Sequence, residues 1–161
     1  MAADVEALYA LTQSPVFHGA PRSALASLAP HARKVLFRAD EVVVEQGKLE
    51  KHFALIIEGR MKVAMAPKNT PSVNRLSDIK LNELREGDCF GEYSLIDRTA
   101  TSASITAVTP GAYFAIPVAR LEEALEADDR FAKSVYANLL KLLLGRLRKK
   151  EREYDLSLLY D

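Results

Sequence analysis

The feature that most constrains the fold is a series of short β-type runs in the middle of the chain. Between residues 34 and 116, β-branched and aromatic residues gather in short segments that glycines and prolines separate. Segments of this length and spacing are typical of a β-sandwich or barrel. We expect strands at Val35–Phe37, Val42–Val44, Phe53–Ile57, Met61–Met65, Ile79–Leu84, Ser102–Val108 and Ala112–Ile116, and an exposed hairpin loop over Ala66–Ser77.

Helical patterns flank this β body on both sides. Before it, short helices are expected at Asp4–Leu11 and Pro21–Leu28, with prolines at their boundaries. After it, a short helix over Val118–Ala127 precedes a long one from about Asp128 to at least Tyr154. We therefore divide the chain into an N-terminal helical segment (1–30), a β-barrel (31–117) and C-terminal helices (118–161).

Composition narrows the class of protein. The 161 residues suggest one domain, and the 22 basic and 22 acidic residues balance, so net charge favours neither nucleic acid nor a membrane surface. No apolar stretch approaches the roughly 18 residues of a membrane span, and the N-terminus lacks the pattern of a signal peptide. Cys89 is the only cysteine, so no internal disulfide is possible. A cytoplasmic protein is expected.

The segment Phe90–Ala107, with the sequence FGEYSLIDRTATSASITA, is the most informative for chemistry. Gly91 would let the backbone approach a ligand closely. Glu92–Ile96 is expected to form one short helical turn, whose first N–H groups are free to bind an anion such as phosphate. Because the Glu92 carboxylate would repel phosphate, its better use is to accept hydrogen bonds from sugar hydroxyls.

This segment resembles the phosphate-binding cassette of cyclic-nucleotide-binding domains. The match rests on Phe90-Gly91-Glu92-x-Ser94-Leu95-Ile96 after Gly87-Asp88, and it extends to Ser14-Pro15-Val16-Phe17, Glu45-Gln46-Gly47, Ile56-Ile57-Glu58-Gly59 and the long terminal helix. The resemblance implies a mainly β fold, a cyclic-nucleotide-binding-type β-barrel (jelly roll) with N-terminal helices and a long C-terminal helix. The cassette would span residues 90–107. The implied ligand is a cyclic nucleotide, with cAMP favoured over cGMP, and no metal.

In the family, the glutamate at the position of Glu92 holds the ribose 2′-hydroxyl, and an arginine ten residues after the cassette glycine pairs with the phosphate. Without gaps that position is Thr101, which cannot give a bidentate charged contact, whereas Ala103 matches the family's alanine. We therefore expect weak or atypical binding. A gapped alignment would instead make Arg98 the phosphate partner. The candidate ligand-binding residues are Gly91, Glu92, Tyr93, Ser94, Arg98, Thr101, Ser102 and Ala103, with Tyr93 expected mainly to pack in the barrel.

Catalytic and metal motifs are not evident. Cys89 reads as a buried thiol, since no nearby sequence supplies a base. His18, His31 and His52 lack the spacing of metal ligands. We therefore do not expect an enzyme.

The terminal helix carries more apolar residues than packing on a barrel requires. Tyr136, Leu140, Leu143, Leu147 and Tyr154 form a stripe at alternating spacings of four and three, which Lys150 interrupts, and other leucines lie beside or opposite it. One face would cover the barrel and the other a second copy, which predicts a homodimer. Gly145 would mark a hinge or a close helix approach. The basic residues from Arg146 to Arg152 read as a solvated face.

The final residues, Leu156–Tyr160, are apolar for a free tail and would dock as a lid or on a partner. We expect no helix-turn-helix domain for binding DNA. Two functions remain open: a stand-alone cyclic-nucleotide-binding regulatory protein, with a signalling protein as a possible partner, or a protein-interaction module that keeps the fold without binding nucleotide.

Overall fold

The computed structural model describes residues 1–66 and 79–159. Its β body consists of two four-stranded antiparallel sheets. In the first sheet the strand order is β1 (Arg33–Phe37), β8 (Gly111–Pro117), β3 (His52–Glu58) and β6 (Cys89–Phe90). In the second the order is β2 (Val42–Val44), β7 (Ser104–Ala107), β4 (Met61–Met65) and β5 (Ile79–Leu84). The predicted mainly β body is confirmed, whereas the loop predicted over Ala66–Ser77 lies, apart from Ala66, outside the described residues.

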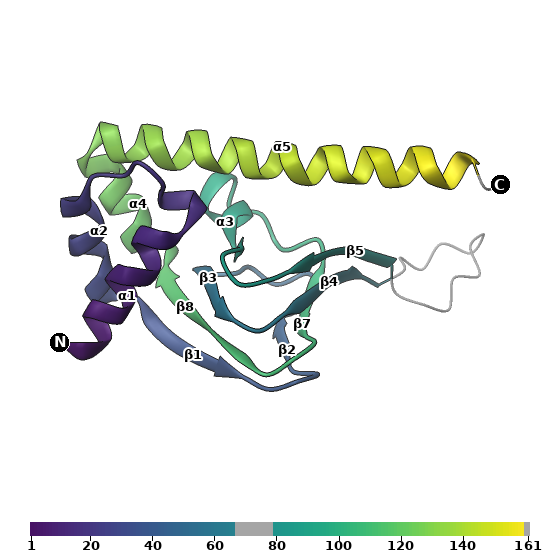
Figure 1. Cartoon of the computed structure of the whole chain (residues 1–161), viewed down its shortest axis with the longest axis horizontal. Helices are drawn as coiled ribbons and strands as arrows, with labels where there is room; N and C mark the ends of the chain where they lie inside the picture. The colour runs from purple at the N-terminus through teal and green to yellow at the C-terminus, as the bar shows by residue number, and fades with distance from the viewer. Residues whose placement is uncertain (67–78, 160–161) are drawn as a thin grey trace.

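Helices surround one end of the sheets (Figure 1). Before the strands come α1 (Ala2–Gln13), the 3-10 turn η1 (Pro15–Phe17), α2 (Arg22–Leu28) and the turn η2 (Ala29–His31). After the strands come α4 (Val118–Ala127) and α5 (Asp129–Leu159), while the short α3 (Glu92–Ile96) interrupts the β body. The helices predicted at both ends of the chain are therefore confirmed, with α1 somewhat longer than expected.

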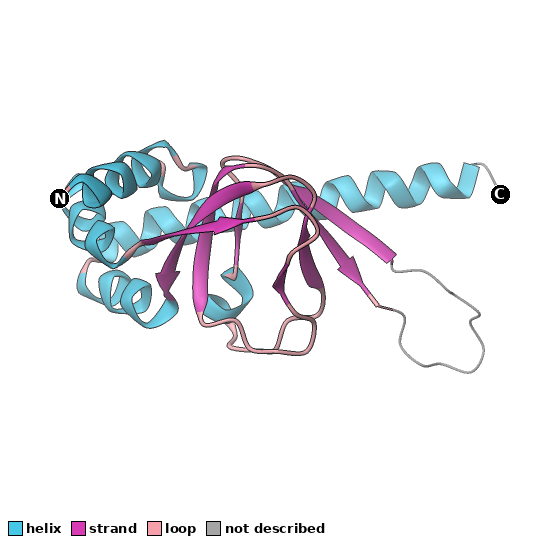
Figure 2. Ribbon diagram, turned by 90° about the horizontal axis from the view of Figure 1, so that it is seen from below, coloured by secondary structure: helices cyan, strands magenta, loops and turns pink. Residues whose placement is uncertain are grey.

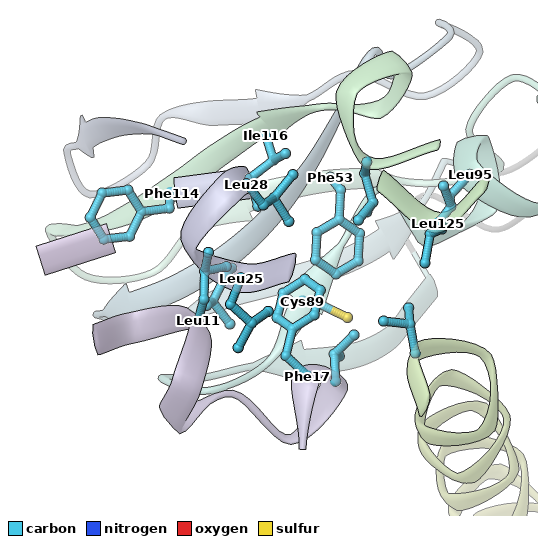
Figure 3. Close-up of a cluster of buried hydrophobic side chains, with 14 of the residues drawn as sticks. Leu11, Phe17, Leu25, Leu28, Phe53, Cys89, Leu95, Phe114, Ile116 and Leu125 are labelled. Atoms are coloured by element: carbon cyan, nitrogen blue, oxygen red, sulfur yellow. The ribbon is translucent and has the colours of Figure 1, made fainter. Parts of the chain in front are cut away.

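Strand β3 is buried on both faces, and this divides the core in two. Successive side chains of a strand point to opposite faces. Phe53 and Leu55 accordingly join a cluster with the helices, while Ala54 and Ile56 join a second cluster between the sheets. Figure 3 shows the first cluster, in which side chains from the N-terminal helices meet those of β3 and β8.

Aromatic contacts fix the base of α5 against this first cluster. The Phe17 ring stacks on Phe131 with the centroids 6.1 Å apart and forms a T-shaped pair with Phe53, whose centroid is 5.9 Å away. Asp128 accepts hydrogen bonds from the backbone N–H groups of Arg130 and Phe131, which satisfies donors that a helix start leaves free. The first turns of α5 are thus part of the core.

The remainder of α5 leaves the helical end of the molecule and runs along one side of the sheets. At 1.5 Å per residue its 31 residues span roughly 46 Å. Figures 1 and 2 both show it extending past the ends of β4 and β5. Residues Leu156–Leu159 continue the helix in exposed positions, so the first of the two alternatives for this tail, a lid, is not what the structure shows for them.

Candidate functional site

A cavity of about 500 Å³ lies between the cassette, the second sheet and α5. Its walls are mostly apolar. The β body and cassette contribute Val44, Glu50, Val63, Asn82, Leu84, Ile105, Cys89, Phe90, Gly91, Glu92, Tyr93, Ser94, Thr101, Ser102 and Ala103; α5 contributes Leu143, Arg146, Leu147, Lys149 and Lys150. Of the eight candidate residues expected from the sequence, all except Arg98 therefore line one cavity.

Gly91 positions the cassette through the protein's own backbone. Its φ of 84° lies in the left-handed region that favours glycine. A Cβ atom here would collide with the carbonyl oxygen of His52 on β3. We expected Gly91 to let the backbone approach a ligand, but in this structure Gly91 lets the cassette approach β3. Helix α3 begins at the next residue, Glu92, which lines the cavity.

Glu92 is buried and paired with an arginine from the far end of the chain. Its Oε1 accepts a hydrogen bond of 2.6 Å from Nη1 of Arg146 on α5. Nη2 of the same guanidinium donates to the carbonyl oxygen of Cys89 at 2.9 Å. Charge-assisted hydrogen bonds of this kind are stronger than neutral ones, especially away from water. The contact joins the cassette directly to α5.

Ser94 presents an unpaired polar atom at the same site. The residue is buried, and its Oγ makes no hydrogen bond to any of the described residues. A buried hydroxyl without a partner costs free energy, so such atoms are uncommon in native proteins. Because Ser94 also lines the cavity, its hydroxyl is available to a ligand group.

Thr101 lines the cavity but its hydroxyl has protein partners. Oγ1 lies 2.9 Å from the carbonyl oxygen of Glu45 and 3.0 Å from that of Lys48. The backbone adds two more links, from Thr101 N to the Lys48 oxygen and from Gly47 N to the Thr101 oxygen. The side chain thus ties the cassette to the turn before β3 and provides no cation to the cavity.

Arg98 lies outside the cavity lining. Its guanidinium donates to both carboxylate oxygens of Glu122 on α4, at 3.0 and 3.1 Å. The backbone at Arg98 has a φ of 56°, and the neighbouring Asp97 accepts hydrogen bonds from Thr99 that lower the pKa of its carboxyl group. Arg98 thus belongs to a turn that docks on α4, and the gapped alignment receives no support from this geometry.

The other cassette residues differ in exposure. Tyr93 is half exposed and lines the cavity, so our expectation that it packs in the barrel is wrong. The first turn of α3 projects it away from the core because Ser94 and Leu95 occupy the inward positions. Ser102 is exposed, and Ala103 is buried directly before β7, which begins at Ser104.

Cys89 is the buried thiol that the sequence predicted. Burial raises the pKa of this thiol, and the nearby Glu92 carboxylate raises it further. The thiol therefore stays protonated at neutral pH and is a poor nucleophile. Within the described residues no group of three or more histidine, cysteine, aspartate or glutamate side chains is arranged to hold a metal ion.

Sequence reasoning missed the part of the site that α5 supplies. We expected Arg146, Lys149 and Lys150 to lie on a solvated face, but all three line the cavity. Leu143 and Leu147, which we placed on the apolar stripe, line it as well. The only sequence signal was the concentration of basic residues in one part of the helix, and it does not indicate which of them face inward.

The comparisons with known proteins identify the class. The chain matches the family described as "Cyclic nucleotide-binding domain" over residues 34–128, and it belongs to that family. It is 33% identical over 82 residues to a cAMP-dependent protein kinase regulatory subunit of Dictyostelium discoideum, covering 51% of this chain and 24% of the relative. It is 30% identical over 101 residues to cGMP-dependent protein kinase, isozyme 1, of Drosophila melanogaster, covering 63% and 13%.

Among solved structures, the catabolite activator protein of Thermus thermophilus is similar at a TM-score of 0.69 and 26% identity. The match covers 89% of this chain and 62% of that one. The chain thus spans about a quarter or less of the two curated relatives and under two thirds of this structure. These findings confirm the family that the cassette resembled and its jelly-roll fold. No helix in the described part of the chain is both long and apolar enough to cross a membrane.

Proposed function

We propose that this chain is a regulatory domain that binds a cyclic nucleotide in the cavity between the cassette and α5. The observation that carries the proposal is the cavity itself, whose cassette wall includes a buried Ser94 hydroxyl without a partner. A volume of about 500 Å³ lies within the range of small-ligand sites. The role is regulatory rather than catalytic.

The cassette supports weak binding of a ribonucleotide. Glu92 would accept a hydrogen bond from the ribose 2′-hydroxyl, as its family counterpart does. Thr101 provides no charge for the phosphate, so we expect a dissociation constant in the micromolar range or weaker. One relative is named for cAMP and the other for cGMP; cAMP remains our favoured ligand.

Calorimetric titration of the purified protein with cAMP and with cGMP tests the proposal. We expect binding of at least one of them, with cAMP the tighter. No heat of binding and no shift in thermal unfolding at millimolar ligand would contradict it.

We further propose that α5 is the output element and that it pairs with a second copy of the chain. Leu140, Leu144 and Leu147 are large apolar side chains exposed on this helix, and Tyr154 and Leu158 continue the series toward its end. Their spacing alternates between four and three residues if the series continues through Glu151, which is the seam of a two-stranded coiled coil. A second copy would remove this surface from water. Ligand binding would alter what the helix contacts.

A second candidate function is a protein-interaction module without nucleotide binding. It is favoured by the engagement of two ligand-binding positions within the protein: Thr101 with the turn before β3, and Glu92 with Arg146. The same calorimetric titration separates the two functions, because this candidate predicts no binding of either nucleotide while the α5 surface stays intact.

A further inference from the structure

The charges around the cavity are divided between its two sides. Glu50 and Glu92 lie on the side of the β body, and Arg146, Lys149 and Lys150 lie on α5. Among the described residues, every cationic side chain that lines the cavity therefore comes from α5. Charges at short range in a partly water-excluded site interact strongly. An anionic ligand would be repelled by the β side alone and attracted once α5 is in place.

The cassette side offers no substitute cation. Thr101 stands at the position of the family's arginine with its hydroxyl already engaged, and Arg98 is paired with Glu122 outside the cavity lining. A ligand phosphate that entered this cavity would have to find its cationic partner on α5.

Arg146 is the best placed of the three cations. Its contacts to Glu92 and to the Cys89 carbonyl oxygen orient the guanidinium at the cassette, and its side chain is three quarters buried. A guanidinium has five N–H groups, and these two hydrogen bonds use only two of them. Lys150 forms an ion pair with Glu153, whereas Lys149 has no ion pair within the described residues.

We propose that Arg146, supported by Lys149, binds the anionic group of the ligand and so replaces the missing cassette arginine. The inference rests on the proposed function, since it assigns a residue to that same site. Its consequence is that anion recognition requires α5 to be docked as it is here. A ligand phosphate would therefore favour the docked position of the helix through its higher affinity for that state.

The test compares cAMP with adenosine, which keeps the base and ribose but has no phosphate. Calorimetry on the full chain gives the ratio of the two affinities, which isolates recognition of the anion. In the wild type we expect cAMP to bind more tightly. Arg146→Gln should reduce this preference by roughly tenfold to a hundredfold, as expected for loss of a hydrogen bond between charged groups.

Two further variants control for other effects of the substitution. Arg148→Gln removes the same charge from an exposed position of α5 outside the cavity lining, and it should leave the preference unchanged. The double variant Glu92→Gln/Arg146→Gln removes both members of the ion pair, so no buried carboxylate is left unpaired. Thermal unfolding verifies that each variant is folded.

Each outcome decides a different point. Loss of the preference in both Arg146→Gln and the double variant supports the proposal. Recovery in the double variant would overturn it, because Arg146 would then serve only to neutralise Glu92. A preference that survives Arg146→Gln, or a wild type that binds cAMP and adenosine equally, would overturn the proposal while nucleotide binding stands. A wild type that binds neither would overturn both.

Discussion

The two halves of α5 are parts of one continuous helix, yet they meet different surroundings. In the first half Phe131, Val135 and Leu139 are fully buried against the helical end of the core. In the second half, from Leu143 onward, large apolar side chains are mostly exposed, and Arg146 makes the polar contacts to the cassette. The first half acts as an anchor for the fold. The second half carries the cationic side chains that line the cavity and a series of exposed apolar side chains.

The two halves meet different surroundings because α5 is longer than the β body beside it. The helix continues because each added residue gains a backbone hydrogen bond to the preceding turn, whatever its side chain contacts. The β body is shorter than the helix, so it can bury only part of it (Figure 2). Four predictions test how far the anchoring half and the free half can be separated.

The largest expected effect concerns the exposed apolar side chains of α5, a series that begins at Leu140, just before the second half, and continues along it. Leu140→Glu combined with Leu144→Glu should convert a dimer to a monomer. A symmetric interface would bury four carboxylates, and each unpaired buried ion costs several kcal/mol. Light scattering measures the mass. Leu143 is not used, since it lines the cavity.

Leu36→Glu serves as the control, because Leu36 is exposed on β1, away from α5. The mass of the Leu36→Glu variant in solution, measured by light scattering, should match that of the wild type. A monomeric wild type at tens of micromolar would rule out self-association and direct attention to a different protein as the partner of this helix.

Substitutions in the two halves of α5 should also differ clearly in their effect on the free energy of unfolding. Phe131 is 0% exposed and Tyr154 is 65% exposed, so truncating each aromatic ring compares the two halves directly. Phe131→Ala should lower the free energy of unfolding by about 3–5 kcal/mol through lost burial and a cavity. Tyr154→Ala should change it by less than about 0.5 kcal/mol. Denaturant titration in the monomeric Leu140/Leu144 background measures both; similar losses would mean that the distal helix is also structural.

Returning a cation to the cassette should reduce the role of the second half in binding. Thr101→Arg places a guanidinium on the β side of the cavity and should tighten cAMP binding by about tenfold or more. In this background Arg146→Gln should cost less than it does in the wild type, because the phosphate has another partner. Calorimetry measures both effects. If affinity is unchanged by Thr101→Arg but lost in Arg98→Ala, the gapped alignment is correct after all.

The smallest effect is expected at Glu92. Glu92→Gln keeps a neutral acceptor for the ribose 2′-hydroxyl, so binding of cAMP should weaken by about tenfold or less. Binding of 2′-deoxy-cAMP should change little, since that ligand has no hydroxyl to lose. Equal losses for the two ligands, measured by calorimetry, would show that Glu92 acts only through its ion pair with Arg146.

Much of the fold could be predicted because its signals are local. Alternating apolar residues and intervening glycines indicated the strands, and Pro117 with the pattern over Val118–Ala127 indicated α4 with its observed bounds. The cassette glycine, glutamate and serine were recognisable as a contiguous motif. The two-residue strand β6 could not be paired from the sequence, because Cys89 and Phe90 provide too little pattern to define their pairing with β3.

The sequence by itself determined the fold class, the position of the cassette and the absence of an arginine at residue 101, because each depends on residues that are neighbours along the chain. Only the tertiary structure decided that Arg146 meets Glu92 across 54 positions of sequence. It also decided that Leu143 faces the cavity while Leu140 and Leu144 stay exposed. The physical reason is that the rotation of α5 about its axis is set by the packing of Phe131, Val135 and Leu139 in the core. Helical periodicity fixes which residues share a face, but not which face meets the protein.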